Sequence, residues 1–371
     1  MKKRVLALTL IILILFSTLM VGTQFINLAT AQTFAAINIK GDRTIEGTDK
    51  IQRNGNVYTL TDNIFNSTIT VTCNNVVLDG SGFTLKGPTG WVDGLGAINL
   101  TCSNVTVQNF NIIGFFEAGI LGAYNGNNIR NNNITRTDRA IAIYADDYYV
   151  EGNYLANNHI AIRIVGKNND VTQNQILNNA EGFSITNSTD NSIVANRIEK
   201  NMFAISTDTG GFQVYHNNFI NQTIGSGGSW EATILSTDYF SLGLNVTLKP
   251  EWDNGYPSGG NYWSDYVTVY PNATEIADSG IGDTAYFIGL SAAINSTHAN
   301  TYIVEAIDRY PLTKPFNIPE PVIPISTPTP TPSPEPTPKI EPFPTALTLV
   351  ATVGIALAVI GLLAYFKKRR R

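Results

Sequence analysis

A phrase of 21 or 22 residues repeats six times between Val107 and Phe219. Each copy has an aliphatic anchor, and a large apolar residue follows five positions later. The anchors are Val107, Ile129, Val150, Val171, Ile193 and Val214, and their partners are Ile112, Ile134, Leu155, Ile176, Ile198 and Phe219. A period near 20 residues indicates a solenoid, in which each turn of the chain packs on the next.

The apolar positions of the repeat are mostly β-branched, and Asn, Gly, Ser and Thr separate them. This composition favours short strands joined by tight turns over the helical returns of leucine-rich repeats. A third apolar position follows about twelve residues after the anchor, which provides three strands for each turn. We therefore predict an all-β fold, a right-handed single-stranded parallel β-helix whose turns stack about 4.8 Å apart.

An asparagine stands three residues after most of the anchors. This row consists of Asn132, Asn153, Asn174, Asn196 and Asn217. Asparagine tolerates left-handed backbone conformations at sharp bends, and stacked amides can donate to and accept from one another. We interpret the row as a structural ladder, and a polar binding strip is the alternative. A second row, at Asn158, Asn179 and Asn201, receives the same interpretation.

A further copy of the repeat carries the only two cysteines of the chain. The pattern Thr-Cys-X-Asn-Val occupies residues 72–76 and returns at residues 101–105, which adds a rung anchored at Leu78. In this register Cys73 and Cys102 are neighbours on adjacent rungs. A spacing of about 4.8 Å lies within the Cα range of a disulfide, and an exported protein permits one. A pair of free, buried thiols is the alternative.

The composition outside the repeats predicts how the chain is divided. The segments are a signal peptide (1–31), N-terminal cap and lead-in strands (32–72), the β-helix repeats (73–223), an aromatic and Gly-rich C-terminal cap (224–316), a Pro/Thr-rich stalk (317–344), one transmembrane helix (345–366) and a basic cytoplasmic tail (367–371). The signal peptide has a basic start, a long apolar run and the cleavage-site pattern Ala29-Thr30-Ala31. An uncleaved N-terminal anchor is the alternative.

The C-terminal segments predict a single-pass protein at the cell surface. Residues 345–366 contain no charge and would span about 33 Å as a helix, enough for a bilayer. The basic residues that follow place the C-terminus in the cytoplasm and the remainder outside. The Pro-rich stalk prefers polyproline II and would hold the outer part away from the membrane. As an alternative, residues 341–344 resemble a sorting signal of archaeal surface proteins, after which the tail is removed.

The aromatic segment has two interpretations. Its side chains could cover the last rung as a cap, or they could form a platform for sugar rings, with Trp252, Tyr256, Tyr262 and Trp263 as the candidate residues. Flat apolar faces edged with hydroxyl groups suit carbohydrate. Asp278 and Asp283, which flank Ser-Gly-Ile-Gly, form a candidate calcium site, the one cofactor that we consider.

Several phrases resemble the NosD family of periplasmic or surface β-helix proteins. They are the Asn-marked rungs, Gly-Gly-Asn-Tyr-Trp-Ser-Asp-Tyr at residues 259–266, Gly-Ile-Gly-Asp at 280–283 and Asp-Arg-Tyr-Pro at 308–311. The resemblance covers most of residues 38–315, and the stalk with its single anchor is similar to archaeal members. It implies a right-handed β-helix of the kind found in carbohydrate-binding and sugar-hydrolysing proteins.

The family name also implies copper handling, which we keep as a second alternative function. Copper favours His, Cys and Met ligands. Between the signal peptide and the membrane segment these are His159, His216, His298, Met202, Cys73 and Cys102, and they are scattered over the rungs.

Charge restricts the partners. Eight of the 24 basic residues lie in the signal peptide and tail, so residues 32–344 carry 16 basic and 29 acidic residues. A negative ectodomain argues against nucleic acid as a partner. Nine Asn-X-Ser/Thr sequons fit an exported glycoprotein.

We identify no catalytic residues. Glycoside hydrolysis needs two carboxylates about 5–10 Å apart. In the column ten residues after the anchor, Glu117, Arg139 and Glu181 fit stacked opposite charges better, as do Arg130 and Glu151 in another column. We therefore expect a non-catalytic surface protein that binds glycans or has a structural role in the cell envelope. Its partners would be polysaccharide or other cell-envelope components. A polysaccharide-active lyase or hydrolase is the first alternative.

Overall fold

The computed structural model describes residues 35–87, 96–115, 117–207, 209–222, 234–236, 251–288, 290–292 and 306–322. These residues form a parallel β-solenoid of about seven turns, and among them the one α-helix is α2 (Tyr266–Val269). The described residues contain no helix that is both long enough and apolar enough to cross a membrane. The predicted signal peptide, membrane helix and basic tail lie outside the described residues, as does most of the stalk.

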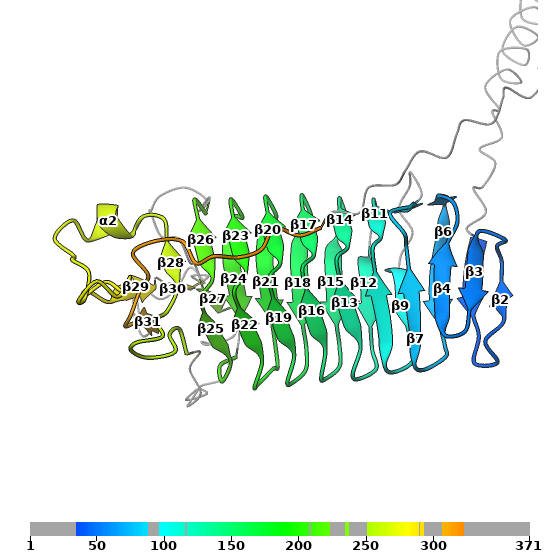
Figure 1. Ribbon diagram of the computed structural model, residues 1–371, viewed down its shortest axis with the longest axis horizontal. Helices are drawn as coiled ribbons and strands as arrows, with labels where there is room; N and C mark the ends of the chain where they lie inside the picture. Colours follow the sequence, from blue (N-terminus) through cyan, green and yellow to red (C-terminus); the bar gives the residue numbers. More distant parts are fainter. Residues whose placement is uncertain are drawn as a thin grey trace, which may run out of the picture. The chain divides into compact units, whose positions relative to one another are not determined.

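Three sheets run along the solenoid, and each turn contributes one strand to each sheet (Figure 1). The first sheet contains β2 (Ile45–Glu46), β1 (Ala35–Ile39), β6 (Ser67–Val71), β9 (Gly96–Leu100), β12 (Ala118–Gly122), β15 (Arg139–Ile143), β18 (Ile160–Ile164), β21 (Glu181–Ile185), β24 (Phe203–Thr207), β27 (Ile234–Ser236) and β30 (Leu290–Ala292). The second contains β3 (Ile51–Asn54), β4 (Val57–Leu60), β7 (Val76–Asp79), β10 (Val105–Gln108), β13 (Asn128–Arg130), β16 (Tyr149–Glu151), β19 (Asp170–Thr172), β22 (Ser192–Val194) and β25 (Gln213–Tyr215). The third contains β5 (Ile64–Phe65), β8 (Thr84–Lys86), β11 (Asn111–Ile113), β14 (Asn133–Thr135), β17 (Tyr154–Ala156), β20 (Gln175–Leu177), β23 (Arg197–Glu199), β26 (Asn218–Ile220) and β28 (Tyr262–Trp263).

The pairing of the strands confirms the predicted register. In the second sheet Val107 pairs with Ile129, Ile129 pairs with Val150, and the pattern continues to Val214. Leu78 pairs with Val107, so its turn is the additional rung expected from the cysteine pattern. Because each position meets its own equivalent on the next turn, one repeated phrase specifies most contacts between turns.

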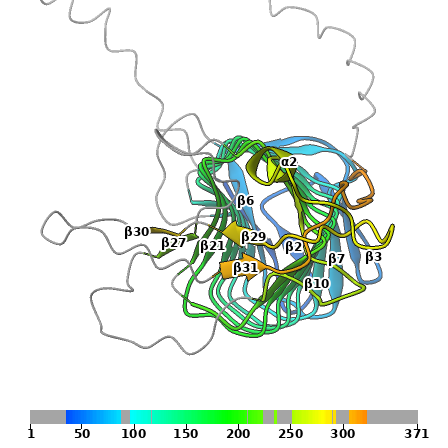
Figure 2. The same ribbon diagram turned by 90° about the vertical axis from the view of Figure 1, so that its left-hand side faces the viewer.

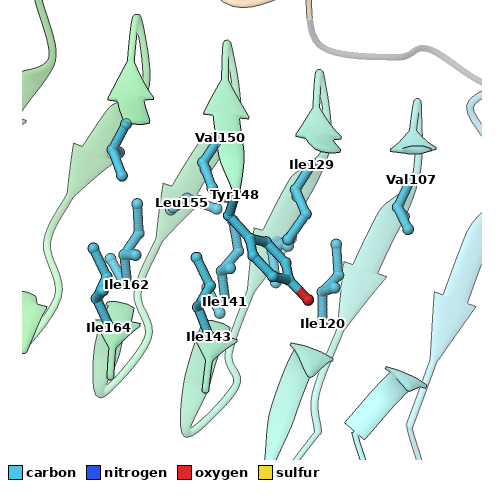
Figure 3. Close-up of a cluster of buried hydrophobic side chains, with 14 of the residues drawn as sticks. Val107, Ile120, Ile129, Ile141, Ile143, Tyr148, Val150, Leu155, Ile162 and Ile164 are labelled. Carbon is cyan, nitrogen blue, oxygen red and sulfur yellow. The ribbon is translucent and has the colours of Figure 1, made fainter. Parts of the chain in front are cut away.

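The core consists of apolar columns that run through the turns. Figure 3 shows anchors of the second sheet facing isoleucines of the first, with the ring of Tyr148 among them. The Tyr148 ring needs space on the neighbouring turn, and Gly122 provides it. A Cβ atom on Gly122 would lie 2.0 Å from the Tyr148 hydroxyl oxygen, so an alanine there would clash.

The corners between strands have a common backbone geometry. The residue before each ladder asparagine is left-handed, with φ of 54° at Asn131, 55° at Gln173 and 57° at His216. The ladder asparagines themselves do not have a left-handed backbone. The expectation that asparagine stands there because it tolerates that conformation was therefore wrong. The left-handed residue bends the chain, and the next side chain then turns inward.

The two ends of the solenoid are closed differently. At the N-terminal end, β1 pairs antiparallel with β2 and β3 with β4, while β4, β5 and β6 already pair in parallel with the next turn. At the C-terminal end, a short antiparallel pair is formed by β29 (Tyr286–Ile288) and β31 (Ala306–Asp308). Figure 2 shows this pair and α2 in front of the superimposed turns.

Aromatic rings continue the core into this cap. Phe219 stacks on Trp263 with ring centroids 4.4 Å apart, and Trp263 stacks on Tyr286 at 4.3 Å. Trp263 pairs with Phe219 in the third sheet, so it continues the apolar column that begins with Ile64 and includes Ile112. Trp252 is also buried against these rings. The four aromatic residues together close the last turn.

Candidate functional site

The asparagine row is a continuous chain of hydrogen bonds. The Oδ1 atom of Asn174 accepts from the backbone N–H and from Nδ2 of Asn153, both at 2.9 Å, and its own Nδ2 donates to Oδ1 of Asn196 at 3.0 Å. The same contacts repeat from Asn132 to Asn217, and all five asparagines are 1% exposed or less. Their amide groups are therefore occupied within the solenoid and do not form a surface for a ligand.

Asn261, in the cap, extends this ladder by one turn, and Asp308 ends it. Asn261 Oδ1 accepts from Nδ2 of Asn217 at 3.0 Å. The Asp308 carboxylate then accepts from the N–H groups of Asn261 and Tyr310 and from the indole nitrogen of Trp263. Burial raises the pKa of Asp308 to about 7, although these three donors oppose the shift.

Two further ladders occupy the other corners of each turn. The second predicted row continues from Asn158 through Asn179 and Asn201 to Gln222. A third row, which the sequence analysis missed, consists of Asn127, Tyr148, Asn169 and Asn191. It lies two residues before the anchor, and Tyr148 interrupts the asparagine pattern there.

The residues of the expected sugar platform separate in the structure. The side chains of Trp252 and Trp263 are 2% and 1% exposed, so their faces pack inside the cap and are closed to a ligand. Tyr256 is 52% exposed, and its ring centroid lies 6.3 Å from that of Tyr310. Tyr262 is partly exposed and belongs to the outer face of the third sheet.

The remaining candidate residues form no joint site among the described residues. The Asp283 carboxylate accepts hydrogen bonds from Thr274 and Thr284, which hold the pKa of Asp283 below its ordinary value, and no group of three or more His, Cys, Asp or Glu includes it or Asp278. Cys73 and Cys102 are buried, free thiols.

The acidic column on the first sheet contains ion pairs. Glu117 lies 2.6 Å from Arg139, the pairing of opposite charges expected from the sequence. Burial raises the pKa of Glu181, and the nearby His159, Ser184 and Arg163 only partly counteract it. A glycosidase needs a second carboxylate close to the first. The groups that shift the pKa of Glu181 are a histidine, a serine and an arginine, so none of them is that second carboxylate.

The outer face of the third sheet carries a different column. One residue before each buried apolar position of this sheet points outward. In register these residues are Asn111, Asn133, Tyr154, Gln175, Arg197, Asn218 and Tyr262. We call this set the outer column. It presents amides, phenols and a guanidinium at intervals of one turn, about 4.8 Å.

A C-terminal strap, residues 313–322, runs across β26, β23 and β20 beside this column (Figure 1). The side-chain amide of Asn218 pairs with the backbone of Phe316: its Nδ2 donates to the carbonyl at 2.9 Å and its Oδ1 accepts from the N–H at 2.7 Å. The Phe316 ring stacks on His216 with a centroid distance of 4.4 Å. Farther along, Gln175 Nε2 donates to Glu320.

Between the strap and the sheet lies a groove of about 260 Å³. Its lining consists of Gln175, Arg197, Asn218, Pro315, Phe316, Asn317, Ile318 and Glu320. Arg197 is held by Glu199, which accepts from Nε at 2.9 Å and from Nη2 at 2.6 Å. Burial alone would raise the pKa of Glu199, but hydrogen bonds from Lys200 and Arg197 hold it below its ordinary value. The guanidinium is therefore a fixed cation beside amide groups.

The comparisons with known proteins give one match. Residues 164–268 match the family model described as periplasmic copper-binding protein (NosD). This stretch contains the last three anchors of the solenoid, much of the groove floor and the first phrase of the cap. No curated protein and no solved structure matches the chain.

The matched stretch offers little to copper. It contains one histidine, one methionine and no cysteine. His216 lies 2.9 Å from the Ser258 carbonyl and stacks on Phe316, while Met202 lies on another turn. The donors of this stretch do not fit a copper site. The two thiols, Cys73 and Cys102, lie outside it. Over residues 164–268 the chain is similar in sequence to the NosD family, and its stacked turns form a parallel β-helix.

Proposed function

We propose that this protein is a periplasmic or cell-surface β-helix protein that binds an extended glycan along the outer column, without catalysing its cleavage. The observation that carries the proposal is the outer column itself. Its guanidinium can donate to sugar hydroxyls, and its phenol rings can pack on sugar faces. The side-chain amides of Gln175 and Asn218 are bonded to the strap and line the groove. One turn of the solenoid is about as long as one sugar ring, so successive turns would contact successive sugars.

The groove gives the outer column a concave part. Arg197 and Asn218 form its floor, and Phe316 supplies an aromatic wall. Binding sites commonly combine such a concave surface with a few fixed polar groups. Because Glu199 holds Arg197 in one orientation, little side-chain entropy is lost when a ligand binds.

The placement of the protein is part of the proposal. The right-handed β-helix would be exported by the signal at residues 1–31 and carried on the stalk at 317–344. The apolar segment 345–366 would hold it in the membrane. The family description as periplasmic supports export, and the apolar run followed by five basic residues supports the anchor.

A glycan array with the soluble ectodomain, residues 32–322, tests the proposal. We expect retention of at least one extended polysaccharide, and a loss of affinity of about 10- to 100-fold for Arg197→Ala, because a hydrogen bond from a charged group contributes about 1.5–3 kcal/mol. Arg130→Ala is the matched control, because Arg130 lies exposed on the second sheet and binds Gln108. Equal losses for both variants, or binding to no glycan, would refute the proposal.

A further inference from the structure

The outer face of the third sheet differs in charge from the ectodomain as a whole. Residues 32–344 carry 16 basic and 29 acidic residues, so most of the surface is expected to be acidic. In the strands of the third sheet, and in the residue that follows each of them, the balance is reversed. These positions contain four cations and one acid, namely Lys86, Arg136, Arg197, Lys200 and Glu199. This face is therefore a basic stripe on an acidic protein.

The cations of the stripe are distributed along the axis of the solenoid. Lys86 lies two turns before Thr135, and Thr135 directly precedes Arg136. Glu199, which directly precedes Lys200, lies three turns after Thr135. At about 4.8 Å for each turn, the intervals along the axis are about 10 and 14 Å. An extended ligand on this face would therefore meet a positive charge at several points along its length.

The one acid of the stripe is already bound by two of its cations. Glu199 accepts from Nε and Nη2 of Arg197 at 2.9 and 2.6 Å, and the Lys200 ammonium lies 2.9 Å from its other oxygen. Two cations and one carboxylate leave a net positive charge. The Nη1 group of Arg197 has no partner among the described residues, so it can still donate to a ligand.

The other two cations are not engaged by acids. The side chains of Lys86 and Arg136 are exposed, and neither forms an ion pair with a described residue. Asp138 follows Arg136 closely in the chain, but its carboxylate lies 3.4 Å from Arg139 and 3.0 Å from His159. The charges of Lys86 and Arg136 are therefore available to a ligand.

The strap places a carboxylate of its own on this face. Glu320 accepts a hydrogen bond from the Gln175 amide of the outer column and lines the groove together with Arg197. Amide and guanidinium groups are suitable donors to a carboxylate, and a guanidinium can bind one with two parallel hydrogen bonds. The groove thus already accommodates one carboxylate, which the chain itself supplies.

We propose that the ligand of the outer column is an acidic polysaccharide, whose uronic acid carboxylates pair with Arg136, Arg197 and Lys200. This inference rests on the proposed glycan binding and specifies its ligand. Each exposed ion pair contributes little alone, but a polymer forms several of them at once. The surrounding acidic surface repels such a polymer, so the basic stripe also determines on which face it binds.

The test compares each acidic polysaccharide with its carboxyl-reduced form, in which every uronic acid has become a neutral sugar and the linkages are kept. The full-length chain in detergent is applied to an array of both forms. At about 20 mM NaCl we expect the acidic form to bind at least about 10-fold more tightly, and at about 300 mM this preference should fall below about 3-fold, because salt screens exposed charges.

Substitutions assign the preference to the stripe. Arg136→Gln and Lys200→Gln should each weaken binding of the acidic form by about 2- to 5-fold and leave the reduced form unchanged. Glu320→Gln should strengthen it by a similar factor, because a competing carboxylate is removed. Lys167→Gln is the matched control, since this exposed lysine lies at the corner between the first and second sheets, and it should alter neither affinity. Circular dichroism checks the folding of each variant.

The outcomes separate this inference from the proposed function. Equal binding of the acidic and reduced forms, or a preference that salt does not change, overturns the acidic ligand and leaves glycan binding intact. Retention of neither form refutes both. The inference is also overturned if Lys167→Gln weakens binding as much as Lys200→Gln. The same holds if single-stranded oligothymidylate binds as tightly as the acidic glycan, because recognition would then depend on charge alone.

Discussion

Replacement of Asn174 by alanine tests whether the ladder stabilises the solenoid. Asn174 lies in the middle of the row and makes hydrogen bonds to both neighbouring turns. In the variant, the backbone N–H of Asn153 loses its acceptor at a buried position. The Val150 carbonyl also loses the donor that Asn174 Nδ2 provides at 2.9 Å.

The expected cost follows from these contacts. A buried donor left without a partner costs about 1–3 kcal/mol, and each further hydrogen bond that is lost contributes about 0.5–1.5 kcal/mol. We therefore expect Asn174→Ala to lower the free energy of unfolding by about 2–5 kcal/mol. Asn174→Asp should cost at least as much at neutral pH, because it keeps the acceptor but turns a second oxygen toward the Asn196 Oδ1 atom.

Urea unfolding of the ectodomain, followed by circular dichroism and by tryptophan fluorescence, measures the effect. The two probes must give one transition, since a solenoid can unfold in segments. Asp170→Ala is the control, because this residue begins β19 on the same turn and is exposed; its effect should stay within about 0.5 kcal/mol. A change at Asn174 no larger than that at Asp170 would show that the ladder only fills space.

Three further predictions concern the core, the cap and the strap. Gly122→Ala should destabilise the solenoid by about 1–3 kcal/mol, because the added Cβ meets the Tyr148 hydroxyl. A second substitution, Tyr148→Asn, should recover part of this loss, and thermal unfolding of the single and double variants measures the loss and the recovery. Because the pKa of Asp308 is raised to about 7, the folded state binds a proton that the unfolded state releases above about pH 4. Stability from this group therefore falls as the pH rises from about 4 to 7, by about 4 kcal/mol at most, and Asp308→Asn should remove this slope in unfolding measured across that range. Asn218→Ala should release the strap at Phe316, so that limited proteolysis cuts there faster while the unfolding midpoint changes little; an unchanged cleavage rate would contradict the assigned contact.

The solenoid could be predicted because its contacts are encoded within each repeat. Val107, Ile129 and the later anchors meet their own equivalents, so periodicity alone determines the register. The third ladder was missed because its signal is interrupted. Tyr148 replaces an asparagine there, and only the structure shows that its hydroxyl accepts the hydrogen bond from Asn127.

The cap and the groove depend on contacts between distant residues that do not repeat. The aromatic content of the cap allowed two interpretations, a cover for the last rung or a platform for sugar rings. Trp252 and Trp263 are buried, so these two residues belong to the cover. The strap could not be located from composition, because residues such as Phe316 reach the third sheet from about 100 positions away in the chain. The outer column was present in the sequence as the residue before each apolar partner, but its variable chemistry concealed it.

The course of the strap determines how the solenoid responds to mechanical force. A pull on the chain at residue 322 first meets the contacts of Glu320 with Gln175 and of Phe316 with Asn218, which lie on different turns. The strap crosses the strands, so the load is distributed over several turns as shear. The last turn is not peeled away, and the cap beyond Asn261 and Asp308 bears force only after the strap has detached. The strap therefore protects the end of the solenoid from force that is applied through the C-terminal segment.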